Sequence, residues 1–83
     1  MTASEGMVVS VDREGRIFID ETEVSYNDFR LTFPALVKSR KPRSVYLRAD
    51  QRVAYGDVVR VLAAIRTSGV TDVGLVAEEE DRP

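Results

Sequence analysis

The sequence predicts an α+β domain in which two helices pack on one face of a four- to five-stranded mixed sheet. The first observation is the stretch Ser44–Glu78, which has the pattern of a strand, a helix ended by a glycine, and a second strand. Strands joined in this way pair in parallel through a right-handed crossover. The second observation is Met7–Asp20, which has the pattern of a hairpin. The expected order is therefore β-β-(β)-α-β-α-β.

The stretch Ser44–Glu78 is expected to form the core of the domain. Ser44–Ala49 is rich in β-formers, with apolar and polar side chains alternating. A helical face follows, made by Val58, Val59, Leu62 and Ile65. Gly69 stands where a helix commonly ends at positive φ. Val73–Ala77 lacks polar alternation, which is typical of a strand covered on both faces. We therefore expect Leu62 and Leu75 to be buried.

The N-terminal part predicts a hairpin followed by a helix. Met7–Asp12 and Arg16–Asp20 are the expected strands, and Val24 is compatible with a further short strand. Ser25 is the expected N-cap of a helix that runs to about Arg40. The apolar face of this helix is formed by Tyr26, Phe29, Phe33, Leu36 and Val37.

Pro34 lies inside that predicted helix and leaves two alternatives open. Proline removes a helical hydrogen bond at a cost of roughly 3 kcal/mol, so the helix is either kinked or shortened. In the shortened form, Thr32 would cap a helix with Pro34 in its first turn. The apolar period continues across Pro34, which favours one kinked helix.

Length and composition bound the function. Eighty-three residues, 43% hydrophobic and 31% charged, make one small folded domain whose modest core makes self-association unsurprising. We expect a disordered leader at residues 1–6, the folded domain at 7–79 and a charged tail at 80–83. The longest apolar run, Val61–Ile65, is far shorter than the roughly 20 residues that span a bilayer.

Residue types argue against enzymatic chemistry. The chain has no histidine and no cysteine, so the commonest general base and the thiolate metal ligands are missing. No glycine-rich phosphate loop is present. Asp50 and Asp57 are the only carboxylates in the central loop and helix start, and turn and helix-terminus electrostatics explain them. We predict no catalytic residue, no cofactor and no metal.

Two stretches are candidate binding surfaces. Lys38, Arg40, Lys41 and Arg43 form a basic segment at the end of the first helix and in its linker. The signatures of the common RNA-binding folds are absent, so we predict no nucleic-acid binding, while an anionic glycan stays open. Val73, Gly74, Leu75 and Val76 form a short apolar strand with no later strand to cover it, so it is a candidate dimer or partner-binding strand. The alternative is that this strand lies centrally in the sheet.

Three stretches resemble the C-terminal periplasmic domain of the ExbD/TolR family. Val45–Val59 has the sequence V-Y-L-R-A-D-Q-R-V-A-Y-G-D-V-V, similar to the family's strand ending in R-A-D and its V-x-Y loop before the second helix. Ser68–Glu78, S-G-V-T-D-V-G-L-V-A-E, is similar to the family's closing strand. Val9–Asp20, V-S-V-D-R-E-G-R-I-F-I-D, resembles its first hairpin. The resemblance covers roughly residues 7–79.

The resemblance implies a function in the cell envelope. The R-A-D motif and the L-V-x-E ending look more like ExbD, which implies a periplasmic domain working with ExbB and TonB in proton-motive-force-driven outer-membrane transport. The TolR alternative implies work with TolQ and TolA and contact with peptidoglycan. Homodimers are common in the family. An unrelated small α/β nucleic-acid binder is the remaining alternative. The family's transmembrane helix and its membrane aspartate are missing here, so we expect a soluble domain excised from an inner-membrane protein.

Overall fold

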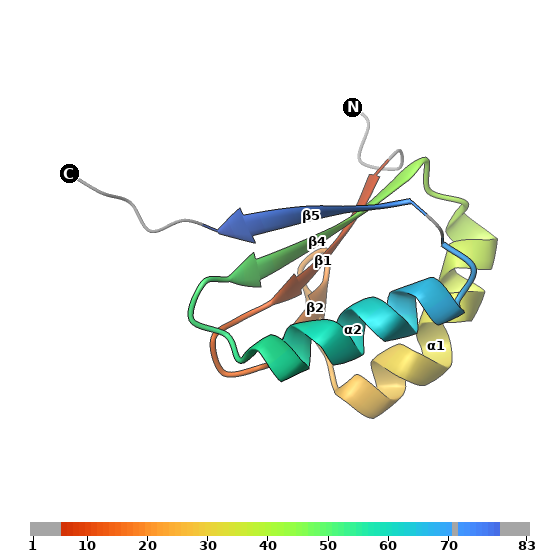
Figure 1. Cartoon of the computed structure of the whole chain (residues 1–83). Coiled ribbons are helices and arrows are strands. Elements are labelled where there is room, and N and C mark those ends of the chain that lie inside the picture. Colours follow the sequence, from red (N-terminus) through yellow and green to blue (C-terminus); the bar gives the residue numbers. More distant parts are fainter. Residues whose placement is uncertain (1–5, 71, 79–83) are drawn as a thin grey trace.

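The computed structural model describes residues 6–70 and 72–78 and shows a five-stranded mixed sheet with two helices, which confirms the predicted fold class (Figure 1). The strands are β1 (Gly6–Val11), β2 (Ile17–Ile19), β3 (Thr22–Val24), β4 (Ser44–Asp50) and β5 (Val73–Glu78), and the helices are α1 (Tyr26–Arg40) and α2 (Tyr55–Thr67). The third short strand expected at Val24 is present as β3. Gly6, which we assigned to the leader, is the first residue of β1. Residues 1–5 and 79–83 of the expected leader and tail lie outside the described residues.

The strand order in space is β3-β2-β1-β4-β5. Strand β1 pairs antiparallel with β2 and parallel with β4, and β4 pairs parallel with β5. The predicted parallel crossover of β4, α2 and β5 is thus confirmed. Both helices lie together on one face of the sheet, and the opposite face carries no helix within the described part of the chain (Figure 1).

Side chains from the helix-covered face of the sheet and from both helices make one core. Within α1, the rings of Phe29 and Phe33 are fully buried and their centroids lie 4.7 Å apart. Alternate residues of β1, β2 and β4 point into the same core, as the two-residue period of a strand requires. The buried core residues are Met7, Val9, Val11, Ile17, Ile19, Phe29, Phe33, Val45, Leu47, Val61, Ala64 and Ile65.

Helix α1 is continuous through Pro34, so the single helix that the apolar period favoured is confirmed and the shorter helix is wrong. Ser25 is its N-cap, and the backbone N–H of Asp28 donates to Ser25 Oγ at 3.1 Å. The Thr32 hydroxyl donates to the Asp28 carbonyl inside the helix instead of capping a new one. The predicted kink at Pro34 stays a prediction.

The ends of the other elements use short polar side chains and glycine. In the β1–β2 turn, Asp12 Oδ1 accepts the backbone N–H groups of Glu14 and Arg16. Partial burial raises the pKa of Asp12, but the hydrogen bonds and charge of Arg16 outweigh that effect and lower the pKa below its ordinary value.

Gly69 follows α2 with φ +101°, which confirms the predicted positive φ. Neither helix is long and apolar enough, over the described residues, to cross a bilayer.

Two predictions about burial are wrong. Strand β5 was expected to be covered on both faces, yet it is an edge strand with 63% of Leu75 and 44% of Val76 exposed. Val59, assigned to the buried face of α2, is 43% exposed, and Leu62 is only partly buried. The five-stranded sheet leaves its outermost strand incompletely covered. In α2, Ile65 is fully buried as predicted, and Val61, which was not assigned to the buried face, is buried as well. An apolar run alone does not show which of its residues face the core.

Large-to-small changes at the buried positions test this placement of the core. We expect Leu47→Ala and Ile65→Ala each to lower the free energy of unfolding by about 2–5 kcal/mol, because both side chains are fully buried. Leu31→Ala is the matched control, since Leu31 is 60% exposed, and it should change stability by less than about 0.5 kcal/mol. Chemical denaturation measures all three. Equal losses for Leu31→Ala and Leu47→Ala would contradict the assigned core.

Candidate partner-binding site at the β5 edge

The two edges of the sheet differ in length and chemistry. Strand β3 has three residues, and its Thr22 and Glu23 side chains are exposed. Strand β5 has six residues and pairs only with β4, so its other side has no strand partner among the described residues. Short, charged edges discourage pairing with other chains, whereas a long apolar edge favours it. The alternative of a central closing strand is therefore wrong, and β5 is the edge suited to pairing.

The register of β5 against β4 divides its side chains between the two faces. Leu75 lies beside Leu47, and partners in a parallel pair point to the same side, so Leu75 is on the helix-covered face. Gly74 lies beside Tyr46, and Val76 beside Arg48, on the open face. An added strand at this edge would meet Leu75 on one face and Val76 on the other.

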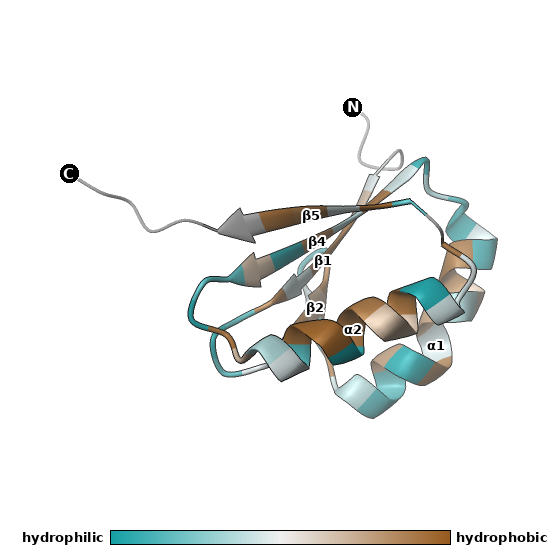
Figure 2. Ribbon diagram, viewed as in Figure 1, coloured by the Kyte–Doolittle hydropathy of each residue, from teal (hydrophilic) through white to brown (hydrophobic). Residues whose placement is uncertain are grey.

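The outward side of α2 adds a second uncovered apolar surface. A shallow groove of about 360 Å³ is lined by Val59, Leu62, Ala63 and Arg66. Figure 2 shows that hydrophobic colour extends along both α2 and β5. The helix-covered half of the domain therefore keeps apolar surface that the described residues do not bury.

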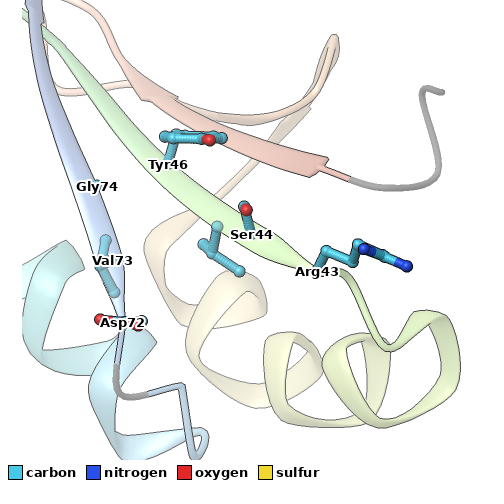
Figure 3. A pocket seen from close by; sticks show the side chains of 7 residues that line it. Arg43, Ser44, Tyr46, Asp72, Val73 and Gly74 are labelled. Atoms are coloured by element: carbon cyan, nitrogen blue, oxygen red, sulfur yellow. The ribbon is translucent and has the colours of Figure 1, made fainter.

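Tyr46 shapes the open face next to β5. A Cβ built on Gly74 would lie 2.7 Å from Tyr46 Cδ1, so the ring covers the Gly74 backbone closely. Tyr46 is 41% exposed and borders a hollow of about 280 Å³ that also contacts Arg43 and Asp72 (Figure 3). Our sequence prediction included Gly74 but missed this contact. The signal was present, because glycine inside a strand often marks a close approach.

The predicted basic surface lies at the end of α1 and in the linker to β4. Arg40 Nη1 is 3.2 Å from Asp20 Oδ2, which ties the end of α1 to the β2–β3 turn. Lys38, Lys41 and Arg43 are exposed. Arg43 is the only one of the four that lines the hollow next to β5, so the basic surface and the β5 strand are neighbouring but distinct features.

The carboxylates considered for catalysis have structural partners, as predicted. Asp50 Oδ1 accepts the backbone N–H of Arg52 at 2.8 Å in the loop after β4. Asp57 lies in the first turn of α2 and pairs with Arg60 at 3.0 Å, and the Arg60 guanidinium lies over the Tyr26 ring. Among the described residues, no polar or charged side chain is buried, and no His, Cys, Asp and Glu cluster could hold a metal ion.

These features define a class of small α+β domain that is suited to contacts with other chains. The helices cover one face of the sheet, the charges lie on the surface, and one apolar edge is open. The chain matches the family model described as biopolymer transport protein ExbD/TolR over residues 1–80, and it belongs to that family. It is 33% identical over 76 residues to a putative biopolymer transport protein ExbD-like 1 of Helicobacter pylori, covering 90% of this chain and 57% of the relative.

Two further relatives carry the ExbD name. The biopolymer transport protein ExbD of Pseudomonas aeruginosa is 29% identical over 70 residues, which cover 84% of this chain and 53% of the relative. The biopolymer transport protein ExbD of Escherichia coli is 28% identical over 71 residues, which cover 86% of this chain and 50% of the relative. The chain thus spans about half the length of these relatives. The family resemblance read from the sequence is confirmed.

The contact of Tyr46 with Gly74 predicts that alanine lowers the stability of the domain at position 74 but not at position 56. Gly74→Ala should destabilise the domain by about 1–3 kcal/mol, because the new methyl group would overlap the Tyr46 ring. Gly56→Ala is the control, since nothing lies within 4 Å of a Cβ at that helical position. Thermal unfolding compares the two variants.

A double substitution separates the ring contact from other causes. In Tyr46→Ala/Gly74→Ala the overlap is gone, so the cost of Gly74→Ala should largely disappear in the Tyr46→Ala background. An unchanged cost would show that Tyr46 does not set the requirement for glycine.

Proposed function

We propose that this chain is the periplasmic domain of an ExbD-like subunit in a proton-motive-force-driven inner-membrane complex of the TonB–ExbB–ExbD type. Its role is to dimerise and to bind a partner in outer-membrane transport, without catalysing a reaction. The observation that carries the proposal is the open, apolar β5 edge in a chain of the ExbD/TolR family. The relatives named as biopolymer transport proteins support the transport role.

Strand addition is the binding mode that the β5 edge supports best. An extended segment can pair with unpaired backbone N–H and C=O groups, which supply affinity, while side-chain contacts supply specificity. Leu75 and Val76 are exposed on opposite faces of β5, so a partner with apolar residues at alternate positions could cover both. The favoured partners are a second copy of this chain and an extended segment of a TonB-like protein.

A dimer through β5 has a defined geometry. In a two-fold interface the same surface meets itself, so the two β5 strands would run antiparallel and extend one sheet across both subunits. Burial of two Leu75 side chains and two Val76 side chains would provide the apolar contribution. The acidic run that begins at the last residue of β5, Glu78–Asp81, would limit this pairing to a weak dimer through repulsion between like charges.

The proton-carrying step belongs to the remainder of such a complex. Asp12, Asp50 and Asp57 are not assigned that role, because these described carboxylates serve turns and a helix start. The proposed ExbB-like subunit and an upstream membrane segment would carry it. The described domain would then transmit the motion through contacts.

Charge placed on β5 tests the proposed interface. Sedimentation velocity over a concentration series should show self-association of the parent chain, and Leu75→Lys should weaken it at least tenfold. Thr22→Lys introduces the same charge on the exposed edge strand β3 and is the matched control. Retention of a TonB-like periplasmic segment on the immobilised domain should fall with the same variant.

Two results would contradict this interface. The first is a parent chain that remains monomeric at millimolar concentration and also retains no TonB-like segment. The second is equal weakening by Leu75→Lys and Thr22→Lys, which would point to a general effect of charge.

A TolR-like contact with peptidoglycan is the second candidate, and the hollow beside Tyr46 favours it. An exposed aromatic ring next to polar side chains is suited to stacking against a sugar, and here the ring is bordered by Ser44 and Asp72. Co-sedimentation with isolated peptidoglycan tests this candidate. Tyr46→Ala should lower the bound fraction severalfold if the hollow binds glycan, and Tyr55→Ala, at a residue 82% exposed on α2, is the control.

A further inference from the structure

One end of the sheet collects the basic residues of α1 and its linker. Strands β1, β4 and β5 run parallel, so all three begin at this end, which we call the entry end. Helix α1 also ends there, because it connects to the start of β4 through a short linker (Figure 1). The cations placed at the entry end are Lys38, Arg40, Lys41, Arg43 and Arg66.

Four of these cations are exposed and have no ion-pair partner among the described residues: Arg66 at the end of α2, and Lys38, Lys41 and Arg43, which lie in one short segment. Arg40 is neutralised by Asp20, but no ion pair within residues 6–70 and 72–78 involves Lys38, Lys41 or Arg43. The nearby acids are Asp20, Glu21 and Asp72. Figure 3 shows the Arg43 side chain extending away from the sheet and away from Asp72. The entry end therefore offers positive charge that the domain itself does not neutralise.

The backbone of this segment has a defined conformation. Lys41 ends α1 in the left-handed region, with φ 46°, and its backbone N–H donates to the Val37 carbonyl at 2.8 Å. Pro42 then restricts the backbone φ angle next to Arg43, the last residue before β4. Three long cationic side chains are thus presented from one short, ordered segment.

At the opposite end of the sheet, several cations are paired with nearby carboxylates. Arg16 pairs there with Asp12 at 2.7 Å and with Glu14 at 2.9 Å, and Arg60 pairs with Asp57. The whole chain has a net charge of −2. An anionic surface would therefore be repelled by the domain as a whole and attracted by the unpaired cations of the entry end, which would orient the domain.

We propose that Lys38, Lys41 and Arg43 form a contact surface for the anionic phospholipid headgroups of a membrane. The inference rests on the proposed function, which places the domain beside the inner membrane. Strand β1 begins at the entry end, so a membrane segment upstream of Gly6 would bring this end toward the bilayer. Lipid phosphates would then meet the three free cations.

The expected affinity of the free domain for an anionic membrane is low, but it is sufficient for a domain that is tethered to that membrane. Each Lys or Arg near an anionic leaflet strengthens binding about fivefold, so three give roughly a hundredfold preference over a neutral membrane. A tether raises the effective concentration and makes such weak contacts count. Screening should remove the preference as salt rises, because the Debye length falls from about 30 Å at 0.01 M to about 8 Å at 0.15 M ionic strength.

Vesicle flotation with the 83-residue chain tests this surface. At about 0.01 M ionic strength the chain should float with phosphatidylglycerol-containing vesicles and not with pure phosphatidylcholine vesicles. Lys41→Glu/Arg43→Glu should lower the partition coefficient at least tenfold. Arg13→Glu/Arg30→Glu makes the same change of net charge at exposed positions away from the entry end and should retain at least half of the binding. Circular dichroism would establish that both variants are folded.

Three outcomes would overturn the inference: equal binding to both kinds of vesicle, equal loss in both double variants, and binding of RNA or peptidoglycan through Lys41 and Arg43 without vesicle binding.

The β5 variant Leu75→Lys separates this inference from the proposed function. Vesicle binding that survives Leu75→Lys while self-association is lost would support two separate surfaces. Intact β5 pairing with no vesicle binding would reject the membrane contact alone.

Discussion

Parallel pairing of β4 with both β1 and β5 is the constraint on which the rest of this structure depends. Val45 and Leu47 extend from β4 into the core, while Tyr46 extends from the other side and covers Gly74. Because parallel neighbours need crossover connections, the helices α1 and α2 are brought onto one face of the sheet. The opposite face and the β5 edge are then left to solvent or to a partner.

The binding surface follows from this arrangement. A strand at the end of a parallel series has one satisfied side and one side that must meet water or another chain. In β5 the unsatisfied side coincides with exposed apolar residues, Leu75 and Val76, whereas the short edge strand β3 presents Glu23 and Thr22. The two edges therefore differ in their suitability for pairing. The same parallel series places the start of β1 and the free cations at one end, which links the proposed membrane contact to the fold.

Local signals in the sequence predicted most of the elements. Ser25 as N-cap, Gly69 at positive φ and the Phe29–Phe33 face each depend on neighbouring residues along the chain, and all three are confirmed. The fold class followed from the order of these elements. The exposure of Leu75 and Val59 could not be predicted in this way, because it depends on how far two helices cover a five-stranded sheet. The open edge of β5 likewise depends on strand order, which the local pattern left open.

Amide hydrogen exchange of β5 is the most direct test of the central claim that this edge is the pairing surface. In the dilute chain, the backbone amides of Val73–Glu78 that point away from β4 should exchange far faster than those bonded to β4. At high concentration, or with a TonB-like segment bound, the outward amides should become protected while those of β3 remain unchanged. Outward β5 amides that stay equally fast in the complex, or protection confined to β3, would contradict the account.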